Sequence, residues 1–159
     1  MPTIDHSKLV RAFYTSFQNK DYKTMQSLYH PDATFSDPVF QNLTSGEVKA
    51  MWQMLIGAGK DLRILFSDIR CDGDQGSCHW EAFYTFSRTG KTVHNIIDTQ
   101  FEFVDGAILR HRDHFNFWRW SRQAFGLTGL AIGWTPFFHN KVSQAASSGL
   151  QKFMTGSRI

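Results

Sequence analysis

Charged residues are scarce in this sequence. Asp, Glu, Lys and Arg make up 19% of its 159 residues, and the formal net charge at pH 7 is only +3. No stretch of the chain concentrates Lys and Arg. Because nucleic-acid binding depends on a basic patch that neutralises phosphates, we expect no nucleic-acid partner.

The sequence also has no long apolar run. Its longest apolar stretch, residues 125–138, is broken by glycine and proline and is shorter than the roughly 20 residues that a bilayer-spanning helix needs. The first residues, MPTIDHSK, are polar and contain no apolar core of a signal peptide. We therefore expect a cytoplasmic location and no membrane partner.

Cysteines are few. Cys71 and Cys78 flank the turn DGDQGS and could face each other across a hairpin, but in the cytosol two free thiols are the expected state. A structural zinc site needs about four ligands, and His79 beside Cys78 does not complete such a set. We expect neither a metal nor another cofactor.

Aromatic residues, in contrast, are abundant. Phe, Trp and Tyr make up 15% of the chain, and Phe alone contributes 15 residues. That many rings fill a large core or line an apolar cavity. Apolar residues recur at helical spacing first and alternate later, which predicts an α+β protein. The predicted helices span 7–20, 21–30 and 44–57, and the predicted strands form an antiparallel meander at 62–70, 78–88, 92–104 and 107–118.

The segment HPDATFSDPVF, residues 30–40, follows the second predicted helix but cannot continue it. Pro31 and Pro38 force the chain, and the residues before them, out of helical geometry. Asp32 is interpreted as a turn residue. Asp37 has two interpretations, because it can cap the turn before Pro38 or face an interior cavity.

This segment and the stretch FVDGAILRHRD, residues 103–113, resemble the nuclear-transport-factor-2-like superfamily. That superfamily includes SnoaL-like polyketide cyclases, ketosteroid isomerases and limonene-epoxide hydrolases. The resemblance implies a cone-shaped α+β roll, with three N-terminal helices packed on a strongly curved antiparallel sheet around a deep pocket. It assigns residues 1–120 to a SnoaL-like, ketosteroid-isomerase-like cone domain. Residues 121–159 then form a helical C-terminal extension, packed on the same domain as a lid or a dimer arm.

The resemblance also implies catalytic residues. Ketosteroid isomerases place a catalytic Asp at the position of Asp37 and a second, protonated Asp at the position of Asp98. The hydrolases and cyclases place an acid on the last strand, at the position of Asp113. We expect these three carboxylates to converge on one cavity, with His111 orienting its neighbour and at least one pKa raised by the apolar walls.

The sequence departs from two of these relatives. The oxyanion-hole tyrosine of the isomerases is replaced by Phe13, with Tyr14 beside it. The Arg-x-Asp pair of the epoxide hydrolases is missing near positions 82 and 84, so epoxide hydrolysis is not expected. The residues expected to line the ligand cavity are Phe13, Tyr14, Trp80, Tyr84, His94 and Phe115.

The strand at 92–104 leaves two alternatives open. One face carries His94 and Asp98, and it is either the wall of a polar-floored pocket or a solvated or dimer-forming face. If it is the pocket wall, the opposite face exposes Val93, Phe101 and Phe103, which are too apolar for water and indicate a homodimer.

Three functions remain compatible with the sequence. The first is a general acid/base isomerase, cyclase or hydratase acting on an apolar or polycyclic ligand that bears a carbonyl. The second is a non-catalytic ligand-binding protein with the same pocket. The third is a dimeric interaction module whose pocket is filled by side chains.

Overall fold

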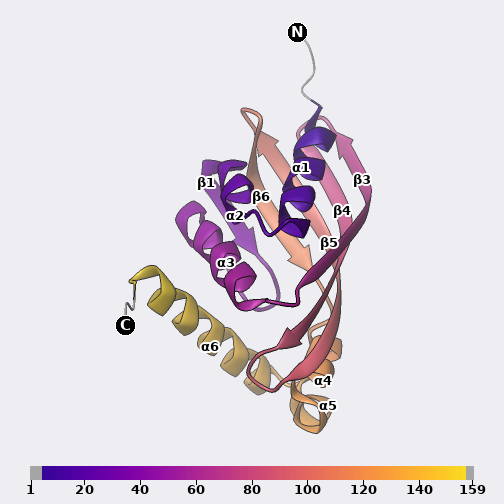
Figure 1. The fold of residues 1–159 in the computed structure, drawn as a ribbon, viewed down its shortest axis with the longest axis vertical. Coiled ribbons are helices and arrows are strands. Elements are labelled where there is room, and N and C mark those ends of the chain that lie inside the picture. The colour runs from indigo at the N-terminus through magenta and orange to yellow at the C-terminus, as the bar shows by residue number, and fades with distance from the viewer. Residues whose placement is uncertain (1–4, 157–159) are drawn as a thin grey trace.

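The computed structural model of the chain describes residues 5–156. It is an α+β structure in which helices lie on one side of a single curved sheet (Figure 1). The elements are α1 (His6–Gln18), α2 (Tyr22–Ser27), β1 (Tyr29–Ser36), β2 (Leu43–Thr44), α3 (Ser45–Ala58), β3 (Arg63–Asp72), β4 (Gln75–Phe86), β5 (Lys91–Val104), β6 (Ala107–His114), α4 (Phe117–Phe125), α5 (Leu127–Ile132) and α6 (Pro136–Met154).

The sheet has six strands in the order β2-β1-β6-β5-β4-β3. Strands β3 to β6 pair antiparallel with their chain neighbours, which confirms the predicted meander. Asp105 and Gly106 both have positive φ, at 52° and 73°, as a tight two-residue hairpin requires. The sequence reasoning missed β1 and β2, and β1 adds a parallel pair with β6.

Strand β1 explains how the proline-containing segment enters the sheet. Tyr29 pairs with Ile108 and Thr34 pairs with Arg110, but the register shifts between these two pairs. Pro31 falls within this irregular stretch, where a missing N–H removes no ladder hydrogen bond. Asp32 lies on β1 and is exposed, so it belongs to a strand and not to the expected turn.

Burial alternates strictly along β5. Val93, Phe101 and Phe103 are 2–3% exposed and pack under the helices, so the expectation that they lie on the outer face is wrong. The apolar residues of the strand belong to the face that the helices cover, because only that face removes them from water. The predicted homodimer therefore loses the support of an exposed apolar face on β5, and it stays a prediction.

The C-terminal segment folds as three helices. Breaks fall at Gly126, between α4 and α5, and at residues 133–135, between α5 and α6, which begins at Pro136. Proline is favoured in the first turn of a helix, and the Thr135 side chain caps this one by accepting from the N–H of Phe138. Among residues 5–156, no helix is long and apolar enough to cross a bilayer.

Close packing of α5 on α4 depends on glycine. A Cβ on Gly129 would overlap the backbone carbonyl of Ser121, and a Cβ on Gly133 would overlap the Ser121 side chain. Gly129 is the buried residue of α5, which therefore contacts the body of the protein through its glycine side.

We predict that Gly129→Ala destabilises the protein by about 1–3 kcal/mol, because backbone must move to admit the methyl group. Gly57→Ala in α3 is the matched control, since a Cβ there meets nothing within 4 Å. That variant should be neutral or more stable by up to about 1 kcal/mol. Chemical denaturation of both variants measures the difference, and equal stabilities would contradict the close-packing account.

Candidate active site

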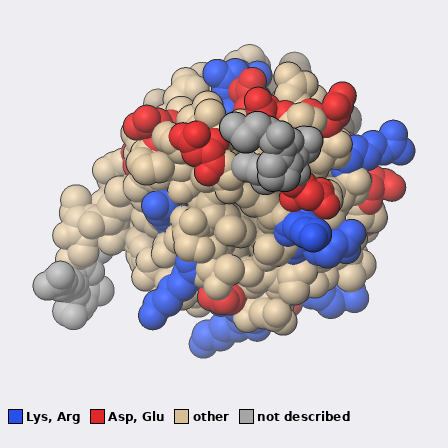
Figure 2. Space-filling view, turned by 90° about the horizontal axis from the view of Figure 1, so that it is seen from above, with Lys and Arg blue, Asp and Glu red and all other residues tan. Residues whose placement is uncertain are grey.

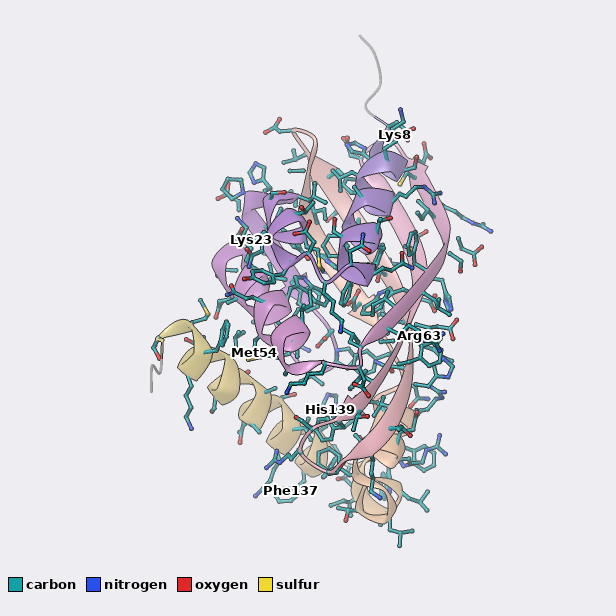
Figure 3. All side chains as sticks on the ribbon, in the orientation of Figure 1. Lys8, Lys23, Met54, Arg63, Phe137 and His139 are labelled. Atoms are coloured by element: carbon teal, nitrogen blue, oxygen red, sulfur yellow. The ribbon has the colours of Figure 1, made fainter. Side chains whose placement is uncertain are left out.

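A largely apolar cavity of about 420 Å³ lies between the sheet and the helices. Its walls come from α3, α4, α6, the loop after β1 and the inner faces of β4, β5 and β6. Figure 3 labels Met54 on α3, which lines the cavity, and His139 on α6. The volume falls within the range of small-molecule sites. The polar side chains that reach its interior include Asp37, Tyr84, Asn95 and Asp113.

Asp113 is buried at the end of a chain of hydrogen bonds. The Trp52 indole N–H donates to the Tyr29 hydroxyl, at 2.8 Å, and this hydroxyl lies 2.8 Å from Nδ1 of His111. The other ring nitrogen, Nε2, lies 2.9 Å from Oδ1 of Asp113. With the Tyr29 proton directed to Nδ1, the imidazole carries its own proton on Nε2 and donates it to Asp113.

A second chain reaches the same carboxylate oxygen. Thr99 donates its hydroxyl proton to Oδ1 of Asp113, at 2.5 Å. The Thr99 oxygen in turn accepts from the Trp80 indole at 2.8 Å and from the Tyr14 hydroxyl at 3.2 Å. Two donors therefore converge on Oδ1, whereas Oδ2 receives no hydrogen bond from the described residues.

Both tyrosines of these chains stay protonated. Burial raises the pKa of Tyr14 and of Tyr29 well above the ordinary value, and the negative charge of Asp113 adds to the effect. A protonated hydroxyl can both accept and donate, which the two chains require.

Asp37 combines the two roles that the sequence left open. Its Oδ1 accepts from the backbone N–H groups of Val39 and Phe40, at 2.7 and 2.6 Å, so it caps the turn. It also lines the cavity. Removal from water raises the pKa of Asp37 to about 7, and the charge of Asp113 contributes to the increase. This agrees with the expectation that one interior carboxylate has a raised pKa.

Asn95 is a cavity residue that the sequence reasoning missed. It is 7% exposed, lines the cavity, and its side chain forms no hydrogen bond with the described residues. Asn95 and Thr99 occupy the same face of β5. The strict alternation of apolar residues along 93–103 was the available signal for that face.

Asp98 and His94 do not reach the cavity, so their expected convergence with Asp37 and Asp113 is wrong. They lie on the outer face of β5, where the Asp98 side chain is 75% exposed and pairs with His79 at 2.8 Å. His94 stacks on Phe83 and pairs with Glu81 at 2.6 Å. Side chains alternate between faces, so a shift of one residue from Asp98 to Thr99 exchanges the outside for the inside.

The other expected cavity residues divide into two groups. Trp80, Tyr84 and Phe115 line the cavity, and Tyr84 accepts a hydrogen bond from the Trp120 indole. Phe13 and Tyr14 are fully buried in the core behind it. Tyr14 contacts the site by donating a hydrogen bond to Thr99.

The described residues contain no group of three His, Cys, Asp or Glu side chains that could hold a metal ion. Cys71 and Cys78 are both free, as expected. Burial raises the pKa of Cys78 to about 12, so its thiol remains protonated near neutral pH.

The wall that α6 contributes is anchored to the Asp37 loop. His139 contacts the Pro38 carbonyl oxygen through Nε2 and stacks on Phe117, with ring centroids 4.1 Å apart. Residues of α6 that face the cavity are small, namely Val142, Ala145, Ala146 and Gly149.

Comparison with known sequences identifies the family. The sequence model of the SnoaL-like domain matches residues 10–111, which is more than half of the chain. The protein belongs to the SnoaL-like domain family. The match confirms the nuclear-transport-factor-2-like superfamily predicted from the sequence. No curated protein sequence matches the chain.

Solved structures share the fold at low identity. One is a hypothetical protein with a ketosteroid isomerase-like fold from Catenulispora acidiphila, in complex with trimethylamine (TM-score 0.67, 14% identity, covering 85% of this chain and 100% of that one). Others are a putative polyketide cyclase from Xanthomonas campestris (TM-score 0.63, 18% identity, 74% and 95% coverage) and an epoxide hydrolase of M. tuberculosis (TM-score 0.59, 18% identity, 78% and 92% coverage). At these identities, the similarity shows the fold alone.

We predict that Asp37→Asn stabilises the protein in a pH-dependent manner. Asn can accept the same two backbone hydrogen bonds, but it never ionises. The pKa of Asp37 in the folded state, about 7, exceeds its ordinary value of 3.8. As pH rises from 3.8 to 7, the unfolded wild-type chain therefore loses this proton before the folded one, and the free energy of unfolding falls.

The stability difference between variant and wild type should thus be small near pH 4, grow up to about pH 7 and stay constant above it. We expect roughly 1–3 kcal/mol above pH 7, because Asp37 is only half-buried and stays partly hydrated. Urea denaturation across this pH range measures the difference. Asp32→Asn, at an exposed position, is the control variant. If the difference in free energy of unfolding between Asp37→Asn and the wild type does not change with pH, the prediction is contradicted.

Proposed function

We propose that this protein is a cofactor-independent acid/base catalyst that abstracts a proton adjacent to a carbonyl group of an apolar ligand. The observation that carries the proposal is the position of two unlike carboxyl groups in one apolar cavity. One, Asp37, has a pKa near 7, and the other, Asp113, is held by two convergent donors. Pairs of titratable groups in contrasting environments are typical of acid/base sites.

Asp37 is the proposed proton-abstracting base. A base works best when its pKa lies near the working pH, because it is then both substantially ionised and strongly basic. Its Oδ1 is held by the turn, which fixes the orientation of the carboxyl group toward the cavity. The ligand lies against the apolar walls of β4, α3 and α6, which exclude water from the reacting atoms.

Asp113 and Asn95 are proposed to bind the ligand oxygen. Oδ2 of Asp113 receives no hydrogen bond from the described residues, so we propose that this carboxylate oxygen accepts one from a hydroxyl or enol group of the ligand. His111 is a positioning residue, because it contacts Oδ1 and not the cavity. The unpartnered Asn95 amide supplies a neutral donor in a site from which water is excluded, where such a donor is most effective.

The same cavity also supports binding without turnover, and this is the second candidate. The observation in its favour is that the hydrogen-bond chains ending at Asp113 stabilise the fold as well as the site, so they do not require catalysis. The two candidates differ in whether a bound ligand exchanges a proton with solvent.

We predict that the wild-type protein catalyses deuterium exchange next to the carbonyl of suitable ligands. A panel of apolar mono- to tetracyclic ketones is incubated in deuterated buffer and followed by proton NMR. The rate should increase as pH rises through about 7, as Asp37 ionises. Asp37→Asn should slow exchange by at least about 100-fold, because it removes the base. Asp113→Asn should slow it by a smaller factor, because it weakens a contact to the ligand and leaves the base in place.

Asp98→Asn is the matched control for these two variants. Its side chain is on the outer face of the sheet, so exchange should continue at the wild-type rate. Ligands that bind, as seen by tryptophan fluorescence, but never exchange would favour the non-catalytic function. Equal loss of exchange in Asp98→Asn would contradict the proposed site.

We also predict that Asn95→Leu weakens ligand binding. The variant removes the amide without reducing the apolar volume, and one hydrogen bond in a buried site contributes about 0.5–1.5 kcal/mol, or about 2- to 13-fold in Kd. Asn95→Gln retains the amide and should recover part of the affinity. Titration with a ketone from the panel measures both, and identical affinities for all three proteins would show that Asn95 does not contact the ligand.

A further inference from the structure

Helix α5 has its apolar side turned outward. The side of α5 that packs on α4 is formed by glycine, with Gly129 buried against Ser121. Leu127 is 83% exposed, Leu130 is 49% exposed and Ile132 is 38% exposed. A surface helix normally buries its large apolar residues, so this arrangement presents them to a partner outside the chain.

Neighbouring elements extend the same surface. Trp134 and Phe137 are each 67% exposed, and Trp118 is 38% exposed and donates from its indole to the Leu130 carbonyl oxygen. We call these six side chains the apolar tip: Trp118, Leu127, Leu130, Ile132, Trp134 and Phe137. Figure 1 shows α4 and α5 together at the lower end of the molecule, and Figure 3 labels Phe137 there.

The charges around the apolar tip have one sign. Arg122 stacks on Trp118 at 4.5 Å and Lys141 lies over Phe137 at 5.2 Å. The β4–β5 hairpin adds Arg88 and Lys91, and it is fastened to α4 by a hydrogen bond from Thr89 to the Ala124 carbonyl oxygen. No Asp or Glu occurs in residues 86–93 or anywhere after Asp113.

The opposite end of the molecule differs. Figure 2 looks onto that end, where Asp and Glu side chains lie among Lys and Arg side chains. Asp72, Asp74 and Asp105 lie at the β3–β4 and β5–β6 turns there. That end thus carries both signs of charge, whereas the charged side chains named around the apolar tip are all cationic, which favours the tip in the field of an anionic surface.

We propose that the apolar tip docks this protein peripherally on an anionic lipid surface. Exposed Trp, Phe and Leu side chains insert into the boundary between headgroups and acyl chains, and the surrounding Lys and Arg side chains bind the anionic headgroups. This proposal departs from the sequence-based expectation of no membrane partner, which rested on the absence of a spanning segment at residues 125–138 and of a signal peptide. The apolar tip lies beyond residue 111, where the match to the SnoaL-like domain ends.

Charge distinguishes this partner from a second copy of the chain. Two copies paired through the same surface would bring Arg88, Lys91, Arg122 and Lys141 of each against the cations of the other. An anionic lipid surface matches both the apolar centre and the cationic border.

The test is flotation of the full chain with vesicles of phosphatidylcholine alone or of phosphatidylcholine mixed with phosphatidylglycerol. We expect binding to the mixed vesicles, weakened by salt, with a blue shift of tryptophan fluorescence. Leu127→Glu and Trp134→Glu should each reduce partitioning on the order of tenfold. Arg122→Gln and Lys141→Gln should each reduce it about fivefold.

Leu65→Glu is the control, because Leu65 is an exposed apolar residue on the outer face of the sheet. It should bind vesicles as the wild type does. All the variants change exposed side chains, and unchanged circular dichroism melting verifies their folding. Absence of binding to mixed vesicles would overturn the proposal. So would concentration-dependent self-association, seen by sedimentation, that Leu127→Glu abolishes while vesicle binding is unaffected.

Discussion

The burial of one carboxylate constrains the rest of this structure. Asp113 is 4% exposed, and a buried charge persists only where donors replace its lost water. Thr99 on β5 and His111 on β6 donate to Asp113 directly. Side chains from the helices and from other strands support these two donors, namely Tyr14 of α1, Trp52 of α3, Tyr29 of β1 and Trp80 of β4. All of these side chains except Thr99 are also part of the aromatic core. The contacts that pack the helices on the sheet therefore also set the orientation of the carboxylate.

The second carboxyl group is positioned by different means. Asp37 depends on a local turn and on the loop that α6 holds in place through His139 and Pro38. Since the charge of Asp113 acts on Asp37 across the apolar cavity, the core network also affects how readily Asp37 gives up its proton. Asp113 is thus held by the hydrogen bonds of the core, whereas Asp37 is held by a local turn at the cavity wall.

Much of this arrangement was predictable, and the exceptions have physical reasons. Helical spacing and alternation predicted the helices and the meander. The resemblance pointed to Asp37 and Asp113, and strand parity placed His111 on the same face as Asp113. The prediction for Asp98 was wrong because it followed the resemblance. The alternation of Val93, Ile97 and Phe101 already identified the face of β5 that the helices cover, and Asp98 is on the other face. Strand β1 was missed because proline usually excludes a strand, and the irregular register that tolerates it appears only in three dimensions. Asn95 gained importance from having no partner, which a sequence does not show.

The small residues of α6 have a consequence for how ligand preference can change. The acid/base groups lie within or directly after the region shared with the family, whereas Val142, Ala145, Ala146 and Gly149 border the cavity from outside it. Replacing these four by larger side chains narrows the cavity at a wall that does not contact the buried network. The two carboxyl groups and this part of the cavity wall thus lie in separate stretches of the chain. Substitutions confined to α6 can therefore change which ligands fit the cavity while Asp37 and Asp113 stay in place.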